Sequence, residues 1–186
     1  MNLRNGARRA SSASHVGFNV VAIATAIVMH CTPVAAQKQD QARANSYEHL
    51  IGTEFEGALI IPGWEDDGGG LMADPVWYHS YRRKDDAHLV LMSWALPRKP
   101  NSSYTPFRVT DVLLIPPVAK DHALTFFCEP PRTNVTEKMF AVVRLDLRRK
   151  WWRDVRKAWK VDLGTGMISP VATKGVACLN EGFGAE

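Results

Sequence analysis

Four histidines are the side chains best suited to general-base or metal chemistry once the first 36 residues are set aside, namely His49, His79, His88 and His122. A hairpin that turns at residues 85–86 places His88 opposite Arg83. His88 then lies four strand positions, or about 13 Å, from His79. A turn one residue longer places the two imidazoles on opposite faces of the sheet. Neither register lets this pair share a metal, so we expect surface or loop histidines, no metal site and no cofactor.

Hydroxyl and carboxyl groups are the other conventional catalytic side chains. The chain has no G-x-S-x-G and no S-x-x-K motif. Asp111 with Glu129 or Asp162 would supply an acid and a base if the fold brought them into one cleft. Alternation with Val112 and Leu114 predicts that Asp111 faces solvent. The sequence therefore predicts no catalytic residue, and a small secreted hydrolase whose acids meet only in the fold is the rival hypothesis.

A basic aromatic segment, residues 148–160, is the most distinctive local feature of the chain. Its cations are interleaved with Trp151, Trp152 and Trp159, a combination that can bind an anionic polymer, a phospholipid surface or a glycan. Trp and Arg also dominate the energetics of protein interfaces. In the alternative interpretation, the tryptophans fill the core and the cations are solvated. The candidate partner-binding residues are Arg149, Lys150, Trp151, Trp152 and Arg153.

Residues 1–36 have the pattern of a secretory signal peptide. Three arginines precede an uncharged apolar stretch at residues 16–29, and small residues follow at 34–36. A membrane-spanning helix needs about twenty apolar residues, and this stretch is shorter. We therefore expect cleavage before Gln37, a periplasmic or secreted protein, and no stable membrane span after cleavage. An uncleaved membrane anchor is the alternative.

Removal of the signal peptide changes the charge and the cysteine count. The full chain has 23 Lys plus Arg against 19 Asp plus Glu, and the signal peptide takes three Arg and no acid, which leaves 20 against 19. A nearly neutral protein gives no support to nucleic-acid binding. Cys128 and Cys178 remain, and an even pair in an oxidising compartment predicts a disulfide that stabilises the fold by about 4 kcal/mol.

Strand patterns fill most of the chain after a polar tether at residues 37–45. The segments rich in β-favouring residues are 57–62, 76–82, 88–96, 108–115, 124–128, 139–147, 167–171 and 175–179. The acidic glycine run at residues 65–70 predicts a loop. Residues 108–115 and 124–128 are expected to form a hairpin. Alternation over residues 139–147 predicts one buried and one exposed face.

Residues 149–161 fit two patterns. Trp151, Val155 and Trp159 are spaced as on an amphipathic helix. Alternation from Val155 onward fits a strand, and the strong turn at residues 162–166 continues a meander. Because the turn and the preceding strand are consistent with each other, we favour the strand.

Many connections between the predicted strands are too short for crossover helices, which favours antiparallel pairing. The fold class that we expect is mainly β, with a single antiparallel sheet-based domain over residues 46–186. It would form a meander, a sandwich or a partly open barrel.

Three blocks resemble recurring segments of small exported proteobacterial proteins of unknown function. They are residues 108–117 (RVTDVLLIPP), 155–166 (VRKAWKVDLGTG) and 175–184 (GVACLNEGFG). The resemblance implies a bacterial origin and a periplasmic domain, and it brings no activity, substrate or functional residue.

These features together predict a noncatalytic envelope protein. Its partner would be another envelope protein or an anionic envelope polymer, and its role that of an inhibitor, an immunity factor or an accessory subunit. A surface patch of basic and aromatic residues would favour this hypothesis. A cleft in which two carboxylates, or a histidine and a carboxylate, converge would favour the hydrolase.

Overall fold

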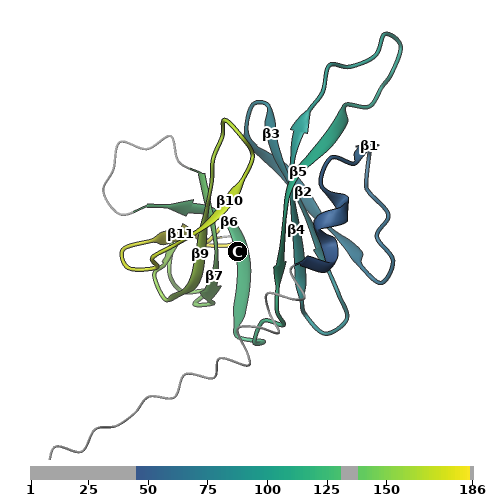
Figure 1. Cartoon of the computed structure of the whole chain (residues 1–186). Helices are drawn as coiled ribbons and strands as arrows, with labels where there is room; N and C mark the ends of the chain where they lie inside the picture. The colour runs from purple at the N-terminus through teal and green to yellow at the C-terminus, as the bar shows by residue number, and fades with distance from the viewer. Residues whose placement is uncertain (1–44, 131–137, 185–186) are drawn as a thin grey trace, which may run out of the picture. The chain divides into compact units, whose positions relative to one another are not determined.

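The computed structural model describes residues 45–130 and 138–184, which form two antiparallel β-sheets after a short 3-10 helix, η1 (Asn45–Leu50) (Figure 1). The predicted signal peptide and residues 37–44 of the predicted tether lie outside the described residues. Within the described ranges, no helix is long and apolar enough to cross a membrane. The prediction of a mainly β, antiparallel fold is confirmed.

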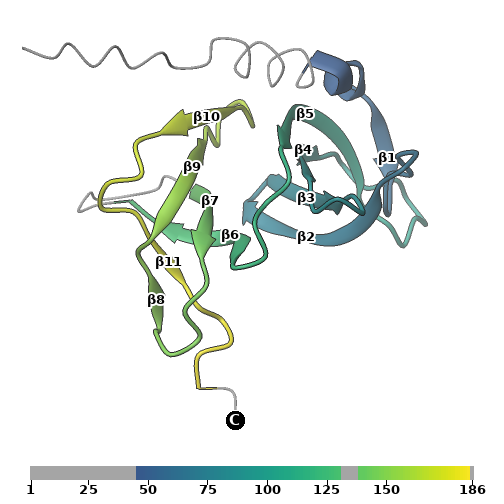
Figure 2. The same ribbon diagram turned by 90° about the horizontal axis from the view of Figure 1, so that it is seen from below.

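The first sheet has the strand order β1-β5-β4-β3-β2 and is strongly curved (Figure 2). Its strands are β1 (Glu54–Glu56), β2 (Glu65–Ala73), β3 (Val76–Arg82), β4 (His88–Ala95) and β5 (Pro106–Ile115). β2 to β5 pair in sequence order, and β1 pairs with the other edge of β5. Residues 89–92 of β4 are fully buried, because this strand has neighbours on both edges and apolar packing on both faces. β4 is therefore the central strand of this sheet.

The second sheet has the strand order β10-β9-β7-β6-β11-β8. Its strands are β6 (His122–Glu129), β7 (Lys138–Arg144), β8 (Trp151–Trp152), β9 (Val155–Val161), β10 (Ile168–Val171) and β11 (Ala177–Leu179). The strand interpretation of residues 149–161 is confirmed, with a break at residues 153–154 that separates β8 from β9. β8 leaves the meander and pairs with β11 at the edge of the sheet.

Apolar side chains of the two sheets pack against each other. Met92 of the first sheet belongs to the same buried cluster as Phe140 and Trp159 of the second. Tyr78 of β3 stacks on Phe126 of β6, with 3.8 Å between the ring centroids. The two sheets therefore share a core, which β4 and β7 line from opposite sides.

The glycine run at residues 65–70 belongs to β2, so the prediction of a loop is wrong. Glycine is needed because β3 runs very close: a Cβ at Gly69 would lie 2.6 Å from the carbonyl oxygen of Tyr78, and one at Gly70 2.9 Å from the Tyr78 ring. A bulge interrupts the pairing just before Gly69, where Gly68 has a φ of 96°. The run is a bulged edge strand.

Two other predictions about strands are wrong. Residues 57–62 form no strand, and β1 occupies Glu54–Glu56 instead. Residues 108–115 and 124–128 do not form a hairpin, because they belong to different sheets. The prolines at residues 116–117 end β5, since proline has no backbone N–H to continue the ladder.

β7 lacks the exposed face that the alternation over residues 139–147 predicted. The strand ends at Arg144, and residues 139–143 are all buried. Phe140 faces the cluster between the sheets, whereas Ala141 belongs to the cluster around the disulfide. A strand packed on both faces must be apolar at every position, which the alternating pattern did not reveal.

The predicted disulfide between Cys128 and Cys178 is present, with an S–S distance of 2.08 Å. The two cysteines are directly opposed on β6 and β11. Together with apolar residues of β7 and β9 they form a third buried cluster. The bridge therefore fixes the last strand to the second sheet.

Candidate functional site

His79 lies in the aromatic core of the first sheet and has a structural role. Its Nε2 is 2.8 Å from the Oγ of the fully buried Ser93. The rings of Phe55 and Phe107 lie edge-on to the imidazole, with centroids at 5.0 and 5.1 Å. Burial lowers the pKa of His79 to about 4, against a smaller upward effect of Asp66. The imidazole is neutral near pH 7, and the prediction of a surface or loop histidine is wrong for His79.

His88 pairs with Arg82 rather than with Arg83, so the turn is one residue longer than a turn at residues 85–86. His88 therefore lies on the opposite face of the sheet from His79. Its Nδ1 lies 3.8 Å from Asp67 Oδ2, beyond hydrogen-bond reach, and bonds to no described residue. Burial lowers the pKa of His88 more than Asp67 raises it. With His122, these two residues line a hollow of about 370 Å³. Across the described ranges, no group of three or more His, Cys, Asp or Glu is placed to hold a metal ion.

The other two histidines are also engaged in local hydrogen bonds. His122 Nδ1 lies 2.7 Å from Asp121 Oδ1, and the Nε–H of Arg156 donates to His122 Nε2 at 3.2 Å. Because Nε2 accepts, Nδ1 carries the proton and donates to the carboxylate. His49 hydrogen-bonds the carbonyl oxygen of Ser46 within η1. The Asp121 and His122 pair is thus held by Arg156.

The carboxylates that the hydrolase hypothesis would use bind backbone groups. Asp111 Oδ2 accepts a hydrogen bond from the backbone N–H of Ile168 at 2.7 Å, which joins β5 to β10. Asp111 is half-buried, so the prediction that it faces solvent is wrong. Asp162 accepts two backbone hydrogen bonds within its own turn. Glu129 is exposed at the end of β6. Asp111 and Asp162 therefore serve the fold.

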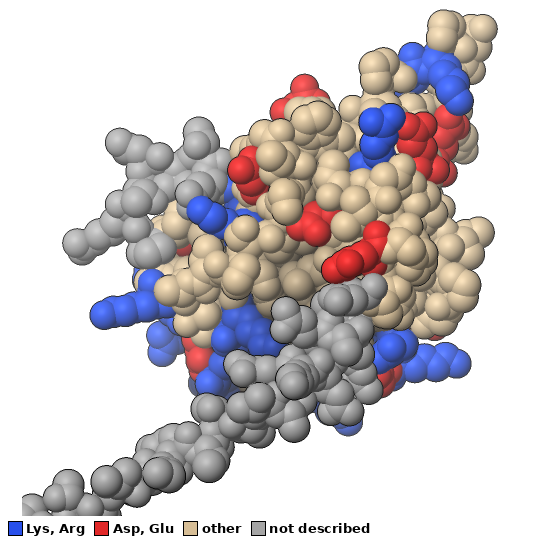
Figure 3. All heavy atoms as spheres, viewed as in Figure 1, with Lys and Arg blue, Asp and Glu red and all other residues tan. Residues whose placement is uncertain are grey.

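Arginine side chains line a hollow where the chain leaves β7 and returns as β8. The hollow measures about 430 Å³, and we call it the arginine hollow; its lining residues are Arg144, Leu145, Asp146, Arg148, Arg149, Trp152, Arg153 and Asp154. Four guanidinium groups face two carboxylates, so the lining is positively charged. Figure 3 shows several Lys and Arg side chains over the part of the molecule where Figure 1 places the second sheet.

The ion pairs around the arginine hollow leave positive charge unmatched. Asp146 serves two cations, with its carboxylate 3.1 Å from Arg149 Nε and 3.7 Å from Arg148 Nε. Asp154 pairs at 3.3 Å with Arg156, which lies outside the lining. Arg153 forms no ion pair with any described residue. A guanidinium without a carboxylate partner is available to an anionic ligand.

The three tryptophans of the basic aromatic segment occupy different environments. Trp159 is buried and stacks on Phe140, as the core interpretation predicted. Trp152 is half-buried against the disulfide cluster, and its Nε1–H donates to the carbonyl oxygen of Asp146 at 3.0 Å. Trp151 is half-buried beside it on β8. Trp152 therefore offers a ligand its ring but no free N–H.

Three of the five sequence-predicted site residues, Arg149, Trp152 and Arg153, line the arginine hollow. Lys150 and Trp151 adjoin it in the sequence but are not among its lining residues. The five predicted site residues did not include the other lining residues, Arg144, Leu145, Asp146, Arg148 and Asp154. The sequence pattern could have indicated the two aspartates, because acidic residues that interrupt a basic run can position its cations.

The arginine hollow has the donors to bind an anion. Arginine presents a planar fork of donors that matches carboxylate and phosphate oxygens. Comparison with family models, curated proteins and solved structures finds no match to this chain.

Proposed function

We propose that this chain is an exported, noncatalytic binding protein that recognises anionic groups of an envelope protein or polymer through the arginine hollow. The observation that carries the proposal is the unmatched charge of the lining. Arg144 pairs with Asp121 and Asp154 pairs with Arg156, both outside the lining, so Asp146 alone faces Arg148, Arg149 and Arg153. Arg153 has no ion pair among the described residues. The predicted residues Arg149, Lys150, Trp151, Trp152 and Arg153 belong to this region.

The chemistry of the lining supports an anionic ligand. Asp146 divides one negative charge between two guanidinium groups, so donors of Arg148 and Arg149 remain unused. A ligand carboxylate or phosphate would accept from these donors and from Arg153. The ring of Trp152 adds an apolar wall against which the ligand can pack.

The compartment supports the same function. A disulfide persists in oxidising compartments, which fits an extracellular or periplasmic protein. The predicted signal peptide and the resemblance to exported proteobacterial proteins favour the periplasm. There the protein would act as an inhibitor, an immunity factor or an accessory subunit, each of which needs a stable binding surface and no catalysis.

The test compares two charge-matched variants of the mature protein. R149Q/R153Q removes two cations of the arginine hollow, whereas K84Q/K174Q removes two exposed cations from elsewhere on the surface. Each protein is titrated with poly-L-glutamate at low salt, and binding is followed by tryptophan fluorescence. We expect R149Q/R153Q to bind at least tenfold more weakly than the wild type. K84Q/K174Q should stay within about twofold, since dispersed surface charges contribute little.

Pull-downs from envelope extracts with the same three proteins connect this binding to a native partner. A partner recovered by the wild type and K84Q/K174Q, and lost with folded R149Q/R153Q, would support the proposal. Equal affinity of the two double variants for the polyanion would overturn it. Far-UV circular dichroism and thiol labelling verify that each variant is folded and bridged.

A further inference from the structure

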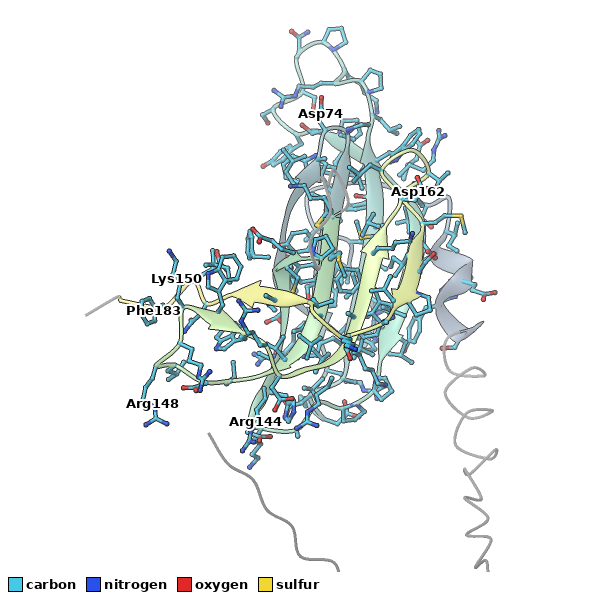
Figure 4. All side chains as sticks on the ribbon, turned by 90° about the vertical axis from the view of Figure 1, so that its left-hand side faces the viewer. Asp74, Arg144, Arg148, Lys150, Asp162 and Phe183 are labelled. Atoms are coloured by element: carbon cyan, nitrogen blue, oxygen red, sulfur yellow. A yellow bond between two sulfur atoms is a disulfide. The ribbon has the colours of Figure 1, made fainter. Side chains whose placement is uncertain are left out.

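Two turns meet at the edge of the second sheet, and we call five of their exposed residues the basic tip: Leu147, Arg148, Arg149, Lys150 and Phe183. Asn180 joins the turns. Its side-chain amide donates to the carbonyl oxygen of Arg149 at 2.9 Å, and its backbone N–H donates to that of Lys150 at 2.9 Å. Figure 4 shows Lys150 beside Phe183, with Arg148 on the same side. The tip is thus a defined surface built from segments about thirty residues apart.

The basic tip combines exposed apolar side chains with cations. Leu147 is 75% exposed and Phe183 47% exposed. The side chain of Arg148 is 93% exposed, and Lys150 is exposed as well. Large apolar side chains beside clustered cations are typical of proteins that lie on a membrane surface, where the apolar groups enter the interface and the cations meet phosphates.

The exposure of these apolar side chains favours a lipid bilayer over a polyanion as the partner. Leu147 and Phe183 stand out from the surface, and a polyanion without apolar groups would leave them in water. A bilayer surface accommodates projecting side chains and supplies apolar and anionic groups together. Charge complementarity selects an anionic bilayer, because residues 144–153 contain five basic residues against one acidic residue, and the second turn adds only the exposed Glu181.

We propose that the basic tip docks the mature protein on the surface of an anionic phospholipid bilayer. Leu147 and Phe183 enter the headgroup region, and the three cations of the tip bind lipid phosphates. This docking goes beyond the proposed function, because it adds the apolar residues Leu147 and Phe183 and the cation Lys150. The basic tip shares Arg148 and Arg149 with the arginine hollow.

Co-sedimentation with vesicles tests the docking. The mature protein is mixed with vesicles of phosphatidylglycerol and phosphatidylcholine in equal parts, and separately with pure phosphatidylcholine. We expect binding to the anionic vesicles, little binding to the neutral ones, and release by high salt. L147S/F183S should lower the partition coefficient at least tenfold. The matched control I60S/M167S removes two exposed apolar side chains from elsewhere and should stay within about twofold of the wild type.

Poly-L-glutamate titrations separate this proposal from the proposed function. L147S/F183S should bind the polyanion as the wild type does, because the arginine hollow is intact. Absence of vesicle binding by the wild type, or equal vesicle binding by folded L147S/F183S and I60S/M167S, would overturn the docking even if the polyanion still binds. R149Q/R153Q removes Arg149 from both surfaces, so the docking is decided by the comparison of L147S/F183S with I60S/M167S on vesicles.

Discussion

Asn180 is 4% exposed, and its hydrogen bonds account for the burial of a polar side chain. The amide donates to the carbonyl oxygen of Arg149, and its Oδ1 accepts from the backbone N–H of Gly182 at 3.1 Å. Leaving a buried amide without hydrogen-bond partners costs about 1 to 3 kcal/mol. Any rearrangement that separates the two turns therefore carries this cost. A single residue therefore holds the cations of the basic tip close to Phe183.

The lowered pKa of His79 makes the stability of the protein depend on pH. Its pKa is about 4 in the folded protein, below the value of 6.5 for an unperturbed histidine, so the unfolded chain binds more protons between these two values. The stabilising effect of the neutral imidazole is complete above pH 6.5 and is lost as the pH falls toward 4. The expected loss is about 3 kcal/mol in the free energy of unfolding.

Urea unfolding at pH 7 and near pH 4.2 measures this loss in the wild type and in H79Q. The wild type should lose about 3 kcal/mol more than H79Q over this range. His88 contributes in the same direction in both proteins, because burial lowers its pKa as well. Asp85 has a pKa of about 2. Its effect on the free energy of unfolding changes below its ordinary pKa of 3.8, outside the pH range of this measurement. Equal losses in both proteins would contradict the structural role of His79.

The disulfide allows a prediction about how the pairing of β6 with β11 contributes to stability. It joins β6 to β11 across a separation of 50 residues, and the chain-entropy model gives about 4 kcal/mol of stabilisation for such a loop. Reduction should therefore lower the free energy of unfolding by about this amount, measured by urea unfolding with and without a phosphine reductant. Denatured, unreduced mature protein should show no reactive thiol, and two reactive thiols would contradict the bridge.

Strands with clear turns on both sides were predictable, and strands defined by tertiary contacts were not. β3 and β4 are joined by a charged turn, and β9 and β10 by the turn at residues 162–166. These local signals suffice for a hairpin. In contrast, the glycines of β2 are required by the closeness of Tyr78, and the separation of β5 from β6 depends on how the sheets pack. Neither fact is encoded in local propensity.

The candidate site was predictable to the extent that it is local in the sequence. Arg149, Trp152 and Arg153 lie within one basic aromatic run, which the composition alone identifies. Asn180 could not be found in this way, because its contact with Arg149 spans 31 residues. The role of Trp159 also required the fold, since spacing alone fits both a core position and an exposed one.

The distribution of charge over the whole molecule matters more for binding than its sum. Without residues 1–36 the chain has 20 basic and 19 acidic residues, yet residues 144–153 contain five basic residues against one acidic residue. Fields of surface charges are screened within about 8 Å at physiological salt. A partner at the arginine hollow therefore experiences a cationic site although the protein is nearly neutral.

Side-chain NMR of the protein without residues 1–36, recorded during titration with poly-L-glutamate, tests anion recognition by the arginine hollow. The Nε–H signals of Arg149 and Arg153 and the indole N–H signal of Trp152 report on the arginine hollow, and those of Arg98 and Trp94 report on the first sheet. We expect saturable shifts at the first three signals and none beyond general salt effects at the other two. Shifts spread equally over both sets, or confined to the first sheet, would contradict anion recognition by the arginine hollow.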